Sequence, residues 1–326
     1  MLENGIIINM LNIHDKGVKD RNIFDTFFIY IIVYRIRKTS FGGFIMDKMF
    51  VKNSTGVLKK VLMCRPTYLK AVPINEIAKK WETTELDVEK MEKEHRSLVE
   101  AYEANGVEVV MVDADPRRGN SVFSRDFGGC IREGYILGNF KESVRFLERE
   151  VYKKKMDELG IPMVAECKEG LFEGGDFTFL DDNTLAIGMV ARSNEKGIDE
   201  IRTELSKYGY KVIAVPCDKK YLHLDLCFNL VDEKLAVAYR DGLPKEFLKT
   251  LEDMGIETID ITEESVFNHG CNLQSIGNKR VISLKQNTYV NEELRKRGII
   301  VIDLDITEIL KAGGGPHCMT FPLSRI

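Results

Sequence analysis

The sequence has no two cysteines separated by two residues, and its seven cysteines are widely spaced over 326 residues. Four-cysteine zinc sites and the disulfide frameworks of small secreted domains depend on close or even-numbered cysteines, so the sequence argues against both. We predict free thiols, most of them buried as small apolar side chains, in a cytoplasmic protein.

The chain also has little net charge and no long apolar run. The net charge of −4 provides no basic field for nucleic acid. The longest apolar run, residues 27–34, is far shorter than the roughly 20 residues that a membrane span needs. An apolar content of 44% with 30% charged residues is typical of a globular protein. We therefore expect neither nucleic acid nor a membrane as a partner.

No segment rich in proline, serine and glycine divides the chain, so we predict a single catalytic domain over residues 46–326. Residues 1–45 differ in composition and are predicted to be a non-core extension. Gly42-Gly43 lies just before Met46, and GGAGGT, a ribosome-binding sequence, encodes Gly-Gly. We therefore expect translation to start at Met46 or Met49. The alternative, a signal-peptide core, lacks a small-residue cleavage site after it.

A glycine that opens an apolar strand after a helix-like segment recurs five times, at intervals of 43 to 54 residues. These glycines are Gly106, Gly160, Gly209, Gly255 and Gly298. Each suits a helix C-cap, where glycine adopts the left-handed conformation at little cost. Before the first, Val88, Met91, His95, Leu98 and Tyr102 share one helical face. Thr84 with Asp87 resembles a capping box for that helix.

Five such units favour either a closed repeat or an ordinary doubly wound sheet, and the period alone does not separate them. The position of the polar segments favours a propeller, because a propeller places equivalent segments around one axis. Four of these segments are dense in glycine and reactive residues and a fifth is weaker: Ser124–Gly129, Glu173–Asp176, His223–Asp225, Gly313–Cys318 and Asn268–Asn272. We therefore expect all five to line one central cleft.

Several candidate residues have ordinary interpretations when each is taken alone. Cys318 could be one more buried thiol, although the glycine-rich approach is expected to leave it uncovered. His223 between two leucines could be a core histidine, Glu173 a solvated turn and Asp126 half of a surface ion pair. Taken together, a thiol, an imidazole and a carboxylate supply a nucleophile, its acid/base partner and an orienting group.

Two further carboxylates, Asp126 and Asp225, have no role in ordinary acyl transfer. They are explained if the substrate is a cation, because a planar guanidinium pairs with carboxylates through paired hydrogen bonds. Asp225 is two residues from His223, so on a strand both side chains would point to the same face.

The sequence resembles the guanidino-group-modifying enzymes: arginine deiminases, dimethylarginine dimethylaminohydrolases and amidinotransferases. The resemblance runs from Val61–Pro66 to Pro322, with several motifs in the family's order. It implies a five-bladed α/β propeller of ββαβ units, without metal or cofactor. The implied roles are Cys318 as nucleophile, His223 as general acid/base with Glu173 as its partner, Asp126 and Asp225 as guanidinium clamps, and Arg192 as the ligand of the substrate's α-carboxylate.

Details within the family narrow the substrate. Where this chain has His223-Leu224-Asp225, dimethylarginine hydrolases have a sequence that resembles His-Leu-Lys. The acid at position 225 therefore favours an unsubstituted guanidinium as the substrate group. The chain is too short for the helical insertion of typical arginine deiminases, and it has Gly313 where those enzymes can have arginine.

We therefore expect a cysteine-dependent hydrolase that converts the guanidino group of arginine, or of an arginine derivative, into a ureido product through a covalent amidino-enzyme. An amidinotransferase, in which an amine resolves the intermediate, is the alternative. A non-enzymatic binding propeller would leave Cys318, His223 and Glu173 unexplained. The expected partner is a small guanidino compound, and assembly as a homo-oligomer is compatible with the sequence.

Overall fold

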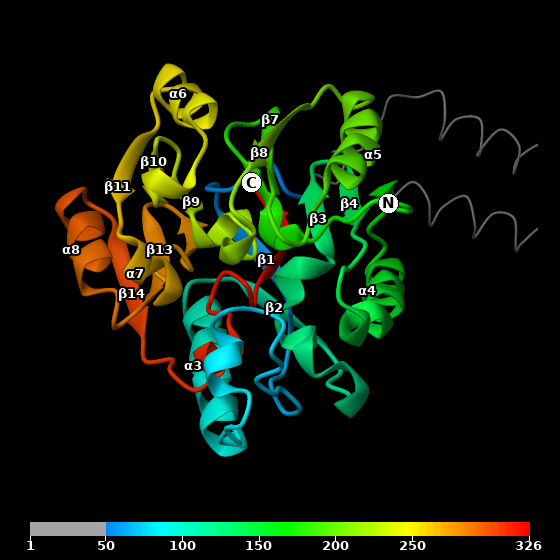
Figure 1. Ribbon diagram of the computed structural model, residues 1–326, viewed down its shortest axis with the longest axis vertical. Coiled ribbons are helices and arrows are strands. Elements are labelled where there is room, and N and C mark those ends of the chain that lie inside the picture. Colours follow the sequence, from blue (N-terminus) through cyan, green and yellow to red (C-terminus); the bar gives the residue numbers. More distant parts are fainter. Residues whose placement is uncertain (1–49) are drawn as a thin grey trace, which may run out of the picture. The chain divides into compact units, whose positions relative to one another are not determined.

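The architecture is a ring of five small sheets in residues 50–326, which are the residues that the computed structural model describes. Each sheet has three strands, formed by an antiparallel pair and a third strand that returns parallel to the middle one after a helix. Figure 1 shows helices α3, α4, α5, α6 and α8 around the rim and the strands toward the centre. The prediction of a five-bladed α/β propeller is confirmed.

Four of the ββαβ units are continuous in the chain. The first two are β3 (Gly128–Ile131), β4 (Gly134–Leu137), α4 (Phe146–Glu158) and β5 (Met163–Glu166), then β6 (Phe177–Phe179), β7 (Thr184–Met189), α5 (Glu195–Ser206) and β8 (Lys211–Pro216). The next two are β9 (Phe228–Asp232), β10 (Leu235–Ala238), α6 (Lys245–Asp253) and β11 (Glu257–Asp260), then β12 (Gln274–Gly277), β13 (Arg280–Leu284), α8 (Thr288–Lys296) and β14 (Ile300–Leu304). A short helix, α7 (Glu263–Phe267), precedes β12.

The fifth unit joins the two ends of the described chain. Its strands are β1 (Leu58–Cys64), β2 (Glu108–Val112) and β15 (Phe321–Arg325), and its helix is α3 (Val88–Ala104). Strand β15 pairs antiparallel with β1, with Leu62 opposite Phe321, so the last strand closes the ring onto the first. Figure 1 shows this C-terminal strand near the centre of the ring.

All five predicted C-cap glycines have positive φ, between 66° and 83°. A Cβ built on any of them meets nothing within 4 Å, so these glycines are explained by backbone conformation and not by crowding. Each is followed by the predicted strand, namely β2, β5, β8, β11 or β14.

Two details of the predicted first helix are wrong. Asp87, and not Thr84, is the N-cap of α3, and its carboxylate accepts a hydrogen bond from the backbone N–H of Lys90. Val88, the first residue of α3, is 46% exposed. The rest of the predicted face, including His95 and Tyr102, is buried.

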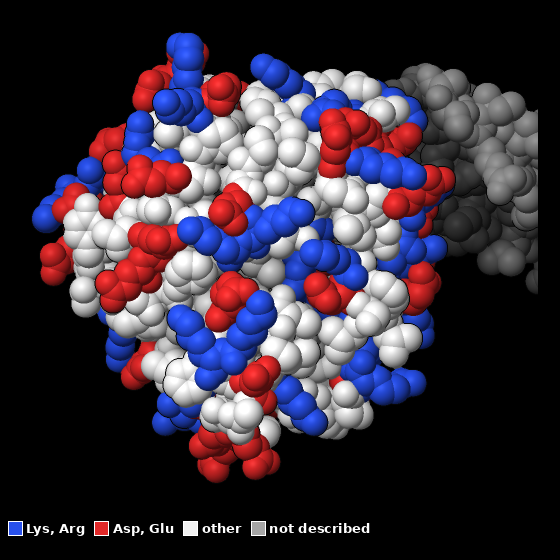
Figure 2. Space-filling view, viewed as in Figure 1, with Lys and Arg blue, Asp and Glu red and all other residues white. Residues whose placement is uncertain are grey.

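Acidic and basic side chains are intermingled over the face shown in Figure 2, which presents no extended basic patch among the described residues. No helix within residues 50–326 is long and apolar enough to cross a membrane. The predictions about residues 1–45 and the translation start concern residues outside the described range, and they stay predictions.

Candidate active site

The five polar segments occupy equivalent positions in the ring. Each comes directly before the strand of its sheet that lies nearest the axis, which is β3, β6, β9, β12 or β15. Three of them form single 3-10 turns: Ser124–Phe127, Gly174–Asp176 and Leu224–Leu226. Because the inner strands surround one axis, segments that are far apart in sequence meet there.

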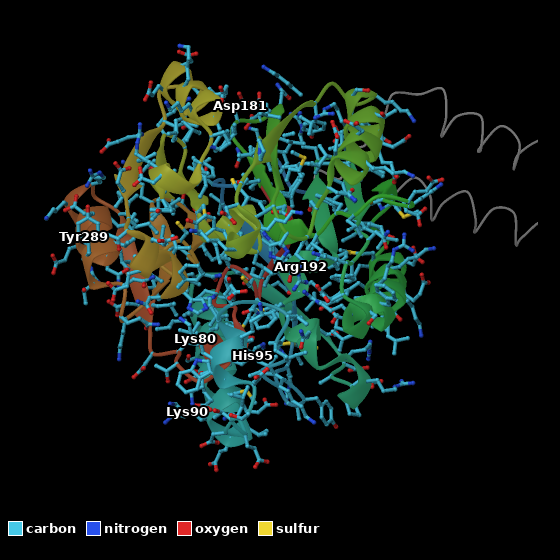
Figure 3. The ribbon with its side chains drawn as sticks, in the orientation of Figure 1. Lys80, Lys90, His95, Asp181, Arg192 and Tyr289 are labelled. Carbon is cyan, nitrogen blue, oxygen red and sulfur yellow. The ribbon has the colours of Figure 1, made fainter. Side chains whose placement is uncertain are left out.

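One pocket collects four of the six predicted site residues. Asp126, Arg192, His223 and Cys318 line it together, whereas Glu173 and Asp225 are buried next to it. Figure 3 shows Arg192 near the centre of the ring, while Tyr289 and Asp181 lie toward its rim. The sequence therefore identified residues that the fold brings together.

His223 and Glu173 form a buried pair. The distance from His223 Nε2 to Glu173 Oε2 is 3.0 Å, and both residues are almost fully buried. Burial favours the neutral imidazole, but the charge of Asp126 and the bond to Glu173 outweigh it and raise the pKa of His223 to about 9. At neutral pH His223 is an imidazolium that can donate a proton.

Gly175 is required by the close packing around His223. A Cβ at this position would lie 2.6 Å from His223 Nδ1 and 3.0 Å from Asp126 Oδ1. Any larger residue would force the imidazole or the backbone to shift, since such contacts are too short for real atoms. Gly175 thus lets the backbone approach His223 closely, whereas its neighbour Gly174 packs against the backbone carbonyls of Gly128 and Arg125.

Cys318 is only 5% exposed, so the expectation of an uncovered thiol is wrong. The loop containing Ile74 and Asn75 lines the same pocket, and the Asn75 amide donates to the carbonyl of Ala312 at 3.2 Å. Burial, followed by the charges of Asp225 and Asp126, holds the pKa of the Cys318 thiol well above its ordinary value. The thiol of Cys318 is therefore neutral in the absence of a bound ligand.

Asn272 contacts Cys318 directly and was not predicted. Its Nδ2 lies 2.9 Å from Cys318 Sγ, and its Oδ1 accepts from the backbone N–H of His317 at 2.9 Å. It therefore fixes both the thiol and the turn that carries it. The only sequence signal was its membership in the weakest of the five polar segments.

Asp225 lies within a 3-10 turn, so the argument that it shares a strand face with His223 is wrong. The chain bends at this turn, and Asp225 faces His317, with Oδ2 2.9 Å from His317 Nδ1 and 3.6 Å from Cys318 Sγ. Burial opposes its ionisation, but the bond from His317 outweighs this and holds the pKa of Asp225 below its usual value. Oδ1 of Asp225 is buried without a hydrogen-bond partner among the described residues.

His317 has a fixed tautomer. Nη2 of Arg125 lies 2.6 Å from His317 Nε2, and an arginine can only donate, so Nε2 accepts and Nδ1–H donates to Asp225. Burial and the charge of Arg125 lower the pKa of His317 to about 4, which agrees with a neutral imidazole. His317 thus orients Asp225.

Asp126 is paired with Arg145, a second residue that the sequence did not single out. Arg145 is buried, binds Asp126 through Nη1 and binds Glu148 through Nη2 at 2.8 Å. This pairing holds one oxygen of Asp126, whereas Oδ1 is buried, has no hydrogen-bond partner among the described residues and lies 3.9 Å from His223 Nδ1. Arg145 stands at the start of α4, far from every polar segment, so no local pattern marked it.

Arg192 is 2% exposed and already has partners. Its Nη2 donates to the carbonyl of Ile74 at 2.6 Å, and its Nη1 lies 3.5 Å from Glu173 Oε1. The contact with Ile74 ties the loop over the pocket to the ring. A substrate carboxylate at Arg192 would have to replace that contact.

Asp126, Glu173 and His223 form one group with potential metal-ligand atoms within 4.8 Å of one another. Nε2 of His223 and Oε2 of Glu173 already bind each other, and Asp126 already binds Arg145. These contacts fit a proton-transfer network with a cationic substrate better than a metal centre, and the absence of a metal stays a prediction.

The chain is similar to known proteins over most of its length. Residues 65–325 match the family model described as N,N dimethylarginine dimethylhydrolase, eukaryotic. YkgA of Bacillus subtilis (strain 168), an uncharacterized protein, is 33% identical over 279 residues, which cover 85% of this chain and 96% of YkgA. An arginine deiminase of Limosilactobacillus reuteri is 26% identical over 251 residues, 63% of this chain and 61% of that protein.

Solved structures share the fold. The N-terminal domain of ArgZ, an arginine dihydrolase from cyanobacteria in complex with its product, has a TM-score of 0.73 at 24% identity and covers 82% of this chain and 97% of that one. DDAH from Pseudomonas aeruginosa, in complex with citrulline, has a TM-score of 0.69 at 22% identity and covers 82% and 100%.

These matches agree with the ring of five ββαβ units and with the site at its axis. The class is that of the guanidino-group-modifying propellers. Within this class, the chain belongs to the N,N dimethylarginine dimethylhydrolase family, as its match over residues 65–325 shows. Named relatives of the chain are hydrolases of guanidino compounds.

Proposed function

We propose that this protein hydrolyses the unsubstituted guanidinium group of arginine, or of a close derivative, with Cys318 as the nucleophile. The observation that carries the proposal is a pair of buried carboxylate oxygens, Asp126 Oδ1 and Asp225 Oδ1, without hydrogen-bond partners among residues 50–326. A buried anionic acceptor without a partner is costly, and a guanidinium supplies planar paired donors. Asp225 lies 3.6 Å from Cys318 Sγ, which would bring the guanidinium carbon close to the thiol.

Substrate binding would activate the nucleophile. The charges of Asp126 and Asp225 contribute to the high pKa of the resting Cys318 thiol. A bound guanidinium compensates both charges and adds a positive charge beside sulfur, so the pKa of the thiol falls and its proton leaves. The thiolate then attacks the guanidinium carbon and forms a tetrahedral intermediate.

His223 would carry the proton in both half-reactions. In the first, its imidazolium protonates the departing amine, the C–N bond breaks and an amidino-enzyme remains on sulfur. In the second, neutral His223 takes a proton from water, the oxygen attacks the amidino carbon, and the C–S bond breaks. As the C–S bond breaks, the hydroxyl proton of the intermediate passes to the departing thiolate, so the thiol and the imidazolium are regenerated. Cationic arginine and water thus give citrulline and ammonium, because the proton that first left the thiol ends on the released ammonia.

The experiment is a substrate panel with purified protein. Arginine, monomethylarginine, dimethylarginine, agmatine and guanidinoacetate are each tested for ureido product, released amine and ornithine. A ureido product with ammonia supports the proposal. Ornithine would indicate the dihydrolase reaction that is named for ArgZ, and turnover that depends on an added amine would indicate an amidinotransferase. Absence of turnover with every guanidino compound would contradict the proposal.

A further inference from the structure

A second cavity lies on the axis of the ring, behind the substrate pocket. It is lined by residues of all five inner strands, including Gly129 of β3, Thr178 of β6, Asn229 of β9, Gln274 of β12 and Arg325 of β15. The substrate pocket and the axial cavity are separated by two short stretches of chain, in which adjacent residues line opposite cavities. Asp126 and Cys318 line the substrate pocket, whereas their neighbours Arg125 and His317 line this axial cavity.

The axial cavity contains two arginines and no carboxylate among the described residues that line it. Arg325 is 1% exposed, and its Nη1 and Nη2 donate to the carbonyls of Gly56 and Ser275 at 2.7 Å each. Arg125 donates to His317. The Nε atoms of both arginines are buried without a partner among the described residues. The two cationic groups therefore share a space in which neutral acceptors are their only hydrogen-bond partners among the described residues. The carboxylates of Asp225 and Asp126, outside the cavity, act on Arg125 through space, whereas no carboxylate contributes to the pKa of Arg325.

Such an arrangement is electrostatically unfavourable unless something compensates the charge. A buried cation without a counter-charge loses its hydration and gains no ion pair in return. Burial and the nearby charge of Arg125 lower the pKa of Arg325 to about 9, because both disfavour the positive charge of its guanidinium group. An anion in the cavity would reverse both effects, because it would interact favourably with the two guanidinium groups at once.

We propose that the axial cavity binds one small inorganic monoanion of the size of chloride, between Arg125 and Arg325. The cavity volume of about 30 Å³ suits one such ion and excludes nucleotides and other large anions. The anion would take up the unpaired Nε donors. His317 links Arg125 to Asp225 through two hydrogen bonds. An anion in the cavity would therefore also change the electrostatic environment of Asp225, next to the substrate pocket.

The binding test uses the full chain without substrate, so its outcome is independent of the proposed hydrolase activity. Thermal unfolding is followed while chloride replaces gluconate, an anion too large for the cavity, at constant ionic strength. Stabilisation by a site-bound ion follows mass action. The melting temperature should therefore rise with the logarithm of chloride concentration above its dissociation constant, by about 2–4 °C per tenfold.

Arg325→Gln should abolish this chloride dependence, whereas the matched control Arg295→Gln, which removes an exposed arginine paired with Asp303, should keep it. An equal melting temperature in chloride and gluconate would overturn the proposal. Crystals of the wild-type protein soaked in bromide supply a test that needs no variant. We expect an anomalous peak within hydrogen-bond distance of Arg125 and Arg325. If the cavity holds water alone and bromide is found on the surface as an adventitious ion only, the proposal is contradicted.

Discussion

At the scale of single residues, the pocket holds a neutral thiol beside an imidazolium. The pKa of Cys318 is raised by burial and by Asp225 and Asp126, whereas the pKa of His223 is raised to about 9 because the charge of Asp126 and the bond to Glu173 outweigh burial. The carboxylate of Asp126 thus favours protonation of both Cys318 and His223. Under the proposed mechanism, His223 is therefore ready to donate a proton before substrate binds, whereas Cys318 loses its proton only when a cation binds beside it.

Exchange of the nucleophile is the first prediction. Cys318→Ser should abolish turnover and leave the free energy of unfolding nearly unchanged, because a hydroxyl is a far weaker nucleophile near neutral pH. Cys217→Ser is the control, since Cys217 is the least buried of the described cysteines and lies outside the pocket. Substantial turnover by Cys318→Ser would exclude the covalent mechanism.

The clamps are tested by removing their charge. Asp126→Asn and Asp225→Asn should each lower kcat/KM by at least about tenfold, because a charge-assisted bond contributes roughly 1.5–3 kcal/mol and an amide donor would face a cationic donor. The loss should persist at high salt, since buried charges are screened little. Asp241→Asn, at an exposed position, is the control.

The same clamps predict substrate preference. Dimethylation replaces both hydrogens on one guanidinium nitrogen, so dimethylarginine should have a lower kcat/KM than arginine. Near-normal efficiency in both asparagine variants, or a clear preference for dimethylarginine, would refute the two-clamp interpretation.

The pH profile tests the His223–Glu173 pair. His223 must be protonated to protonate the departing amine, and its pKa is raised to about 9, so kcat/KM should fall as pH rises through about 9. Glu173→Gln removes a carboxylate that supports the imidazolium, so the fall should move to lower pH. The exposed Glu246→Gln should leave the profile in place. Identical profiles for Glu173→Gln and wild type would show that His223 does not govern this limb.

At the scale of elements, each rim helix passes into its strand through a left-handed glycine. Gly209 has φ of +83°, and a Cβ there would meet no atom within 4 Å, so substitution affects the backbone alone. Gly209→Ala should lower the free energy of unfolding by about 1–2 kcal/mol, the cost of a left-handed residue with a Cβ, and leave kcat unchanged. Urea unfolding measures the difference. Gly209→Asn should lose less, since asparagine tolerates this conformation better, and an equal loss for both would contradict the conformational explanation.

For the ring in residues 50–326 as a whole, the contact between the first and last strands decides whether it stays closed. Phe321 of β15 is 1% exposed, and its ring centroid lies 4.1 Å from that of Phe127, beside the neighbouring sheet. Phe321→Ala should lower the free energy of unfolding by about 3–5 kcal/mol, because it opens a cavity at this junction. Tyr289→Ala, at a side chain 55% exposed on α8, should change it by less than about 0.5 kcal/mol. A small loss for Phe321→Ala would mean that closure does not depend on this strand.

The sequence by itself determined what local chemistry fixes. Glycines such as Gly160 and Gly298 marked the helix ends, because only a residue without a Cβ takes that conformation cheaply, and each polar segment was recognisable from its own residues. The order of the motifs identified the family and with it the five-bladed fold. His223, Glu173, Asp126 and Cys318 were therefore found without coordinates.

Tertiary structure alone decided the relations between distant parts of the chain. Arg145 comes to Asp126 from a helix start without any motif, and Asn272 reaches Cys318 from another sheet. Arg125 and Arg325 face one cavity although 200 positions separate them. Hydrogen bonds and charge interactions act over a few ångströms in space, and no local pattern records which residues the closed ring brings within that distance.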